Sequence, residues 1–180
     1  MAQELKKLNK SFFAKPADAV AKALLGKILT RKINNKLLKA KIVETEAYFG
    51  NKDPASRAFK GKNKISEMMW QEAGKIMIYN VHMYKMFNLV TGKTGIPSAV
   101  LIRALEPLNF QARCSGPGLL TNSLKIDKSL HGQDISSHKE IFILDNPALV
   151  KISKSQRIGV TQDLETPLRF FIKNSPFVSK

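Results

Sequence analysis

The chain has 180 residues, and its 30 lysines and arginines outnumber its 14 aspartates and glutamates, which gives a formal net charge of +16 at neutral pH. Such a surplus favours a polyanionic partner, with nucleic acid ahead of an anionic membrane. The alternative is a lysine-rich surface that reflects only the amino-acid usage of the source organism. The length fits a single domain, residues 1–180, whose core needs no disulfide support.

Cysteine and histidine usage limits the possible chemistry. Cys114 is the only cysteine, which excludes an intrachain disulfide and a cysteine-based zinc cluster and fits a reducing compartment. The three histidines are widely scattered, so we expect no metal and no cofactor. No apolar run reaches the roughly 18 residues of a membrane span, and the first residues have no signal-peptide core. We therefore expect a monomer without membrane contact that is cytoplasmic, or nucleoid-associated in a bacterium.

The first secondary-structure elements have clear boundary signals. A helix is expected over Pro16–Leu25, because proline suits a first helical turn and Gly26 is placed to end the helix. Two strands, Lys27–Ile33 and Lys36–Tyr48, flank the pair Asn34-Asn35. Asparagine tolerates the left-handed conformations of a tight turn, so this segment predicts a hairpin.

The rest of the chain contains more strands than helices. After a long exposed loop, the expected strands are Ile76–Tyr79, Met83–Val90, Ala99–Leu105, Ile141–Leu144, Ala148–Ile152 and Leu168–Ile172. The loop covers Gly50–Lys64, and Ser115 is expected to cap a short helix that ends near Leu124. Strands joined by hairpins instead of crossover helices indicate an α+β fold with a largely antiparallel sheet.

The segment Ile42–Tyr48 places two carboxylates on an apolar strand. Since side chains alternate across a strand, Glu44 and Glu46 are expected on the same face as Ala40 and Ile42. A glutamate on the buried side of a sheet loses hydration, which raises its pKa and allows proton transfer near neutral pH. The alternative is that the strand ends at the surface, where water solvates both glutamates.

Arg103 lies within the apolar strand Ala99–Leu105, where an unpaired guanidinium would be costly. Pairing with Glu44 or Glu46, directly or through water, is the simplest way to satisfy both segments. An arginine and a glutamate that hold one water between them would form a hydrolytic site. A buried salt bridge that only fixes the sheet is equally compatible with the charges.

Six segments occur in one order and at compatible spacing. They are IVETEAYFG (Ile42–Gly50), DPAS (Asp53–Ser56), VLIRALEP (Val100–Pro107), CSGPG (Cys114–Gly118), RIGV (Arg157–Val160) and LRFFIKNSPFVS (Leu168–Ser179). Together they resemble the alkyladenine DNA glycosylase family, also called 3-methyladenine DNA glycosylases, from about Pro16 to Ser179. The resemblance implies a curved, mostly antiparallel sheet with flanking helices and a protruding hairpin that enters the DNA minor groove.

The resemblance also implies a reaction, hydrolysis of the bond between deoxyribose and a damaged purine to leave an abasic site. The purines would be alkylated, deaminated or etheno adducts in double-stranded DNA, flipped out because the bond cannot be reached inside the stack. Glu46 would be the general base that deprotonates the attacking water, and Arg103 with the carbonyl of Ile158 would hold that water. Glu44 would support them. With water as the nucleophile, the enzyme would be monofunctional.

A flipped purine needs aromatic surfaces in place of the stacking it has lost. By resemblance, Tyr48 forms one wall of the base pocket, Tyr79 is the second stacking tyrosine, and Asn88 lies close to the purine edge, where it discourages undamaged guanine. For each tyrosine the alternative is ordinary core packing.

Two positions depart from the family pattern. Arg57 stands where the family usually has the histidine of Asp-Pro-Ala-Ser-His, so a permanent charge should disfavour cationic lesions such as 3-methyladenine relative to hypoxanthine or ethenoadenine. The family hairpin reads approximately Tyr-Ile-Tyr-Gly-Met-Tyr, whereas this chain has YNVHMY over Tyr79–Tyr84. The aromatic wedge is therefore missing, and Val81 or His82 would take its place less effectively.

The positive surplus then has a use, because phosphate contacts supply non-specific affinity for DNA. The candidate contacts are Lys60, Lys62, Lys64, Lys85 and the backbone at Gly116–Gly118. A competing hypothesis is a nucleic-acid-binding protein that keeps this fold without the activity. A carbohydrate glycosidase is disfavoured, because Glu44 and Glu46 lie about 7 Å apart on one side of a strand, whereas such carboxylates flank the scissile bond.

Overall fold

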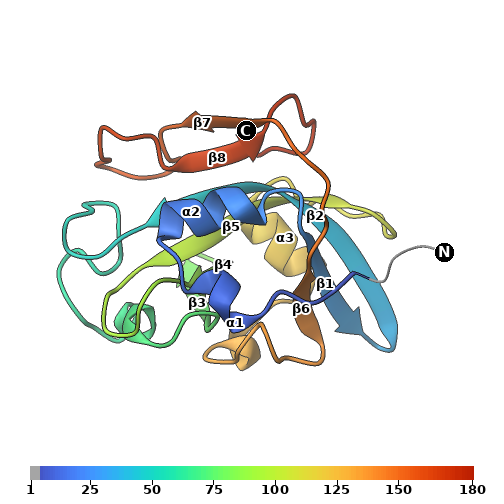
Figure 1. Ribbon diagram of the computed structural model, residues 1–180, viewed down its shortest axis with the longest axis horizontal. Helices are drawn as coiled ribbons and strands as arrows, with labels where there is room; N and C mark the ends of the chain where they lie inside the picture. The colour runs from blue at the N-terminus through green and yellow to red at the C-terminus, as the bar shows by residue number, and fades with distance from the viewer. Residues whose placement is uncertain (1–4) are drawn as a thin grey trace.

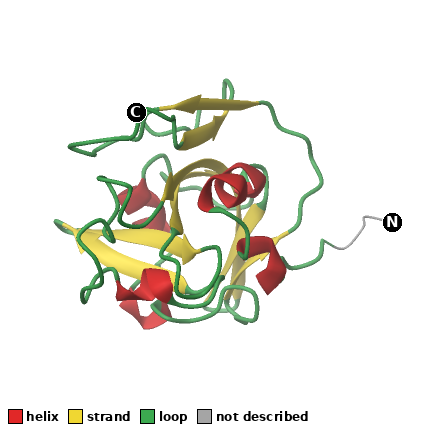
Figure 2. Ribbon diagram, turned by 60° about the vertical axis from the view of Figure 1, so that its left-hand side comes forward, coloured by secondary structure: helices red, strands yellow, loops and turns green. Residues whose placement is uncertain are grey.

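The computed structural model describes residues 5–180 and places an eight-stranded sheet at the centre of the molecule (Figure 1). The strands are β1 (Ile28–Ile33), β2 (Lys36–Tyr48), β3 (Ile76–Val81), β4 (Tyr84–Val90), β5 (Ala99–Pro107), β6 (Ile141–Leu144), β7 (Ile152–Ser155) and β8 (Arg169–Ile172). The helices are α1 (Lys10–Phe13), α2 (Ala17–Leu24) and α3 (Pro117–Ser123), with two short 3-10 helices, η1 (Glu67–Trp70) and η2 (Lys128–Leu130). Neighbouring strands pair antiparallel in the order β3-β4-β5-β2-β1-β6, and the sheet curls visibly (Figure 2). The predicted α+β fold with a curved, mostly antiparallel sheet is confirmed.

Strand β2 connects the two parts of the sheet. Along one side it pairs with β5 from Ala40 to Tyr48. On its other side β1 ends its pairing at Lys41, and β8 pairs with the three residues from Glu44 to Glu46. The two glutamates therefore lie within the sheet, paired on both sides, and the alternative that they are solvated at its end is wrong.

Helix α2 lies across β2 and β5 and covers the main apolar core (Figure 1). Its buried residues Ala17, Val20, Ala21 and Leu24 recur at helical spacing, so one face of the helix is apolar. The hydroxyl of Thr45 donates to the carbonyl of Ala21 at 2.9 Å, which ties the helix to the middle of β2. Thr45 thus faces the α2 core, and Ala47 two residues later belongs to the same core.

The regular alternation of β2 is interrupted near its middle. Its register with β5 shifts between Ile42 and Glu44 and again between Glu44 and Thr45. Ile42 and Ala47 belong to the same apolar core although five residues separate them, which regular alternation forbids. The prediction that Ile42 and Glu44 share a face is therefore wrong, because an irregularity of this kind turns over the side chains that follow it. The two glutamates still share a face, opposite the α2 core.

The chain after β6 runs along the side of the molecule and reaches β2 through strand β8. The connection, orange in Figure 1, rises to the β7–β8 hairpin, and Figure 2 shows the same path from another side. β7 pairs only with β8, while β8 pairs with both β7 and β2. Residues 152–179 are thereby brought to the carboxylates of β2.

Several boundaries differ from those predicted. The α3 cap is Gly116, without a side-chain hydrogen bond, so the expected cap at Ser115 is wrong. The strand expected at Ala148–Ile152 begins at Ile152 instead, and Leu149 is fully exposed. The strands and the asparagine turn of the first hairpin are confirmed, since both asparagines have positive φ angles. Helix α1 had no predicted counterpart. Within residues 5–180, no helix is long and apolar enough to cross a membrane.

Candidate active site

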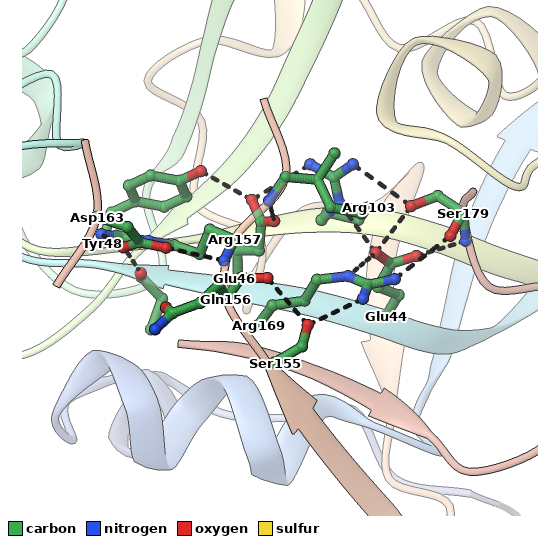
Figure 3. Close-up of polar contacts among 12 residues, drawn as sticks. Glu44, Glu46, Tyr48, Arg103, Ser155, Gln156, Arg157, Asp163, Arg169 and Ser179 are labelled. Atoms are coloured by element: carbon green, nitrogen blue, oxygen red, sulfur yellow. Dashed lines mark hydrogen bonds and ion pairs between the residues drawn. The ribbon is translucent and has the colours of Figure 1, made fainter. Parts of the chain in front are cut away.

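Glu46 is fully buried, and three separate segments donate hydrogen bonds to its carboxylate (Figure 3). Oε2 accepts from the phenol of Tyr48 at 2.7 Å and from Nη1 of Arg103 at 3.2 Å. Oε1 accepts from the backbone N–H of Ile158 at 2.8 Å. Because a carboxylate oxygen has two acceptor sites, Oε1 can accept one further hydrogen bond.

The surroundings of Glu46 move its pKa in opposite directions. Burial raises the pKa of Glu46, while Arg103, the Ile158 N–H and the Tyr48 hydroxyl each lower it, and the balance leaves it above its ordinary value. Burial also raises the pKa of Tyr48, and the neighbouring charge of Glu46 raises it further. Tyr48 is therefore a neutral donor, and Glu46 is a carboxylate suited to accept a proton near neutral pH.

Glu44 is also fully buried and belongs to a second set of contacts beside the first. Its Oε1 accepts from Nε of Arg103 at 3.0 Å and from Nε of Arg169 at 2.7 Å. The hydroxyl and the N–H of Ser179 donate to Glu44 at 2.8 and 2.6 Å. The predicted pairing of Arg103 with a glutamate is confirmed and is direct, and Arg103 contacts both Glu44 and Glu46.

A pocket of about 450 Å³ opens next to the residues that contact Glu46. Tyr48, Arg103 and Ile158, the three residues that donate to Glu46, all line it, together with Arg57, Tyr79, Val81 and others. The carboxylate itself lies just beneath this lining.

The sequence-predicted pocket residues occupy different depths. The Arg57 guanidinium lies 5.0 Å from the centroid of the Tyr79 ring, a cation–π distance, and Arg57 is exposed. Asn88 is buried behind them, and its amide donates to the carbonyls of Met77 and Met86 at 3.4 and 3.2 Å. A small cavity there is lined by Asn88 together with Arg57 and Tyr79. The structure brings Arg57 and Tyr79 to the pocket and places Asn88 one layer deeper.

Arg157 holds the other wall of the pocket, a role that sequence reasoning missed. Its guanidinium lies 4.5 Å from the centroid of the Tyr48 ring and donates to both carboxylate oxygens of Asp53 at 2.7 and 2.6 Å. Burial acts to lower the pKa of Arg157, but Asp53 and Asp163 outweigh it and raise that pKa. Asp53 belongs to the DPAS segment of the sequence, and Arg157 belongs to the RIGV segment. Only the fold shows that these two residues pair. The same holds for Arg169 and Ser179.

The β3–β4 hairpin borders the pocket, and its turn consists of His82 and Met83. The φ angle of His82 is +53°, a conformation that favours glycine. Val81 belongs to β3 and lines the pocket, whereas the Met83 side chain is 79% exposed. Behind the turn, Tyr84 packs so closely on Gly118 of α3 that a Cβ there would lie 2.3 Å from its ring. The turn thus exposes His82 and Met83, and the packing of Tyr84 on α3 anchors its base.

The four predicted phosphate-contacting lysines differ in position. Lys60, Lys62 and Lys64 are exposed in the loop before η1, and Lys85 is half-buried in β4. Within residues 5–180, no three histidine, cysteine, aspartate or glutamate side chains are grouped so that they could hold a metal ion.

A family model described as methylpurine-DNA glycosylase matches residues 11–176. The chain belongs to this family. A relative from Aeropyrum pernix is 38% identical over 96% of this chain and 93% of its own length, and one from Legionella pneumophila is 40% identical over 98% and 100%. Both carry the provisional name 3-methyladenine DNA glycosylase. The resemblance drawn from the six segments is confirmed, and the chain is a DNA glycosylase, an enzyme that hydrolyses N-glycosidic bonds.

Proposed function

We propose that this DNA glycosylase excises alkylated, deaminated and etheno purines from double-stranded DNA. Glu46 is the general base in this proposal, and the enzyme acts as a monomer. The observation that carries the proposal is the buried Glu46 carboxylate, which Tyr48, Arg103 and Ile158 hold directly beneath a pocket. A carboxylate with a raised pKa at the base of a cavity is suited to activate water.

In the proposed reaction, Glu46 Oε1 takes a proton from a water molecule. The water oxygen bonds to C1′ of the flipped deoxyribose, and the bond from C1′ to the purine nitrogen breaks with its electrons leaving on the base. Arg103 and the carbonyl of Ile158 hold the water. Arg103 is well placed for this task because it lines the pocket while its side chain is fixed on the two glutamates.

The flipped purine would stack on Tyr48 and Tyr79, which both line the pocket. Asn88, which is buried behind Arg57 and Tyr79, would lie close to the edge of the flipped purine. There it would discourage undamaged guanine, whose amino group would have less room. Arg57 adds a positive charge to the pocket, so neutral lesions such as hypoxanthine and ethenoadenine should gain relative to cationic 3-methyladenine.

DNA would reach this pocket across the hairpin and the lysine-rich loop. Val81 or His82 would take the place of the family's aromatic wedge. The exposed Met83 beside them is the larger apolar side chain at the turn. Methionine is among the residues that wedge base steps in the minor groove. Lys60, Lys62, Lys64 and Lys85 would contact phosphates, which predicts a steep salt dependence of binding.

The decisive assay incubates the protein with duplexes that carry hypoxanthine, ethenoadenine, 3-methyladenine, 7-methylguanine or uracil. Alkali then reveals abasic sites, and Glu46→Gln is the control. Product from purine lesions that disappears in Glu46→Gln supports the proposal. Binding without product would favour a nucleic-acid-binding protein that has lost the activity, and product that persists in Glu46→Gln would remove Glu46 from its role.

A further inference from the structure

Ser179 is far from the catalytic strand in sequence, yet it is 8% exposed and surrounded by the charged groups of the site. Its hydroxyl donates to Glu44 Oε1 at 2.8 Å and accepts from Nη2 of Arg103 at 3.4 Å. Its N–H donates to Glu44 Oε2 at 2.6 Å, and its carbonyl accepts from Arg169 at 3.3 Å. Every polar atom of Ser179 thus contacts the Glu44 and Arg103 group or its neighbour (Figure 3).

These contacts fix the rotation of the Arg103 guanidinium. Nε is held by Glu44, Nη2 by Ser179 and Nη1 by Glu46. Because the guanidinium is planar, two fixed nitrogens determine where the third one points. Nε and Nη2 are therefore the anchors, and Nη1 is the atom directed at the catalytic carboxylate.

We propose that Ser179 is a positioning residue, which acts through Glu44 and Arg103 to keep Nη1 of Arg103 on Glu46. This inference rests on the proposed role of Glu46. Ser179 does not line the pocket, so it has no path to the purine or the water except through these two side chains. Its loss should slow the chemical step and leave DNA affinity unchanged.

The pH profile provides a readout that a purely structural role would not move. Arg103 lowers the pKa of Glu46, so a displaced Arg103 lets this pKa rise further and moves the acid limb of the rate profile to higher pH. The other charged or titratable groups around Glu46 are Glu44 and Tyr48 of β2, Tyr79 of β3, Arg169 of β8 and, stacked on Tyr48, Arg157. Of these groups only Glu44 contacts the Ser179 hydroxyl, and Glu44 is one of the two side chains through which Ser179 is proposed to act.

The test compares Ser179→Ala, Ser179→Thr and the matched control Ser175→Ala on one lesion duplex. Ser175 lies in the same segment, but its hydroxyl accepts from the N–H of Phe177 and bonds to neither glutamate. Single-turnover excision gives the maximal rate and the half-saturating protein concentration, and thermal unfolding checks the fold. We expect Ser179→Ala to lose about tenfold in maximal rate with an unchanged half-saturation and a raised acid limb. Ser179→Thr should recover most of the rate, and Ser175→Ala should stay within about twofold of the unaltered protein.

Each outcome decides the inference. An unchanged rate and pH profile in Ser179→Ala overturns it, as does an equal loss in Ser175→Ala. If Ser179→Ala does not fold, Ser179→Cys, which replaces the hydroxyl by a weaker donor of similar size, should show a smaller loss of rate and the same shift of the acid limb; no change there overturns the inference. Absence of product from the unaltered protein overturns the proposed function as well, whereas an active protein with a silent Ser179→Ala overturns this inference alone.

Discussion

Replacing Arg57 by glutamine should change which lesions the enzyme prefers. The guanidinium of Arg57 lies 5.0 Å from the centroid of the Tyr79 ring and lines the pocket in which the purine would stack. Glutamine is similar in shape to the inner part of arginine but has no charge. The substitution therefore removes a positive charge next to the purine and leaves Tyr48 and Tyr79 in place.

The size of the effect follows from Coulomb's law. A cationic purine stacked in this pocket would carry its charge roughly 7 Å from the guanidinium, where repulsion is about 0.6 kcal/mol in a water-like medium and about 2.4 kcal/mol at an effective dielectric constant near 20. Because Arg57 is exposed, the lower part of this range applies, about 0.6–1.4 kcal/mol. Arg57→Gln should then raise the excision of a cationic lesion relative to a neutral one by about three- to tenfold.

The assay measures single-turnover excision of 7-methylguanine, which is cationic in DNA, and of hypoxanthine, which is neutral, in the same duplex. Arg57→Lys is the matched control, because it keeps the charge, and its ratio of the two rates should stay near that of the unaltered protein. Arg57→His should move the ratio toward that of Arg57→Gln as the pH rises and the imidazole loses its proton. A ratio that is the same in Arg57→Gln and Arg57→Lys would refute the charge argument, and a change in both rates by one common factor would assign Arg57 to packing.

Four further predictions test other parts of the site. Glu46→Gln should lower the maximal excision rate by about 10²–10⁴-fold and keep DNA affinity. In the unaltered protein the rate should rise with pH through a pKa above the ordinary glutamate value of about 4.5, since the base acts deprotonated, and a flat profile from pH 4 to 8 would contradict this. Asp53→Asn should destabilise the fold by about 3 kcal/mol in urea unfolding, because it leaves the buried Arg157 charge with Asp163 as its one remaining carboxylate partner, and an unchanged midpoint would refute that reasoning. Met83→Ala should slow excision from a fully paired duplex more than from a mismatched one, whereas Met83→Tyr should do the opposite; equal effects on both substrates would exclude a wedge at the hairpin tip.

The link between Arg103 and the two glutamates was predictable because burying a charge leaves few solutions. An arginine within an apolar strand must meet an anion, and only β2 offered carboxylates within a comparable apolar strand. The same reasoning could not choose between a structural bridge and a catalytic one. The proposed catalytic role rests on the pocket above Arg103, which is assembled from strands, a helix start and loops that lie far apart in the sequence.

The sequence pattern failed where the backbone departs from regular geometry. Alternation predicted Ile42 and Glu44 on one face, but a register shift between them places Ile42 in the α2 core and Glu44 opposite it. Irregularities of this kind have no dependable signature in one sequence. Ser179 and Arg157 were missed for a different reason, since each is more than 100 residues away from its partner on β2 or in the loop that follows. Both residues belong to segments that carry the family resemblance, but nothing in those segments shows which distant side chain each of them contacts.

The arrangement of charge explains how one molecule can attract polyanionic DNA and also keep carboxylates buried beneath its pocket. Around Glu46 the structure groups four carboxylates with three guanidiniums, namely Glu44, Glu46, Asp53 and Asp163 with Arg103, Arg157 and Arg169. The net charge of this group is close to zero or slightly negative, so the surplus of +16 is carried by the rest of the chain, in large part by exposed lysines. Long-range attraction to phosphate therefore acts on the outer surface and is screened by salt, whereas the pairs beneath the pocket are screened much less. Raising the salt concentration should consequently weaken DNA binding steeply and leave the maximal single-turnover rate nearly unchanged, because the contacts that orient Arg103 on Glu46 are buried.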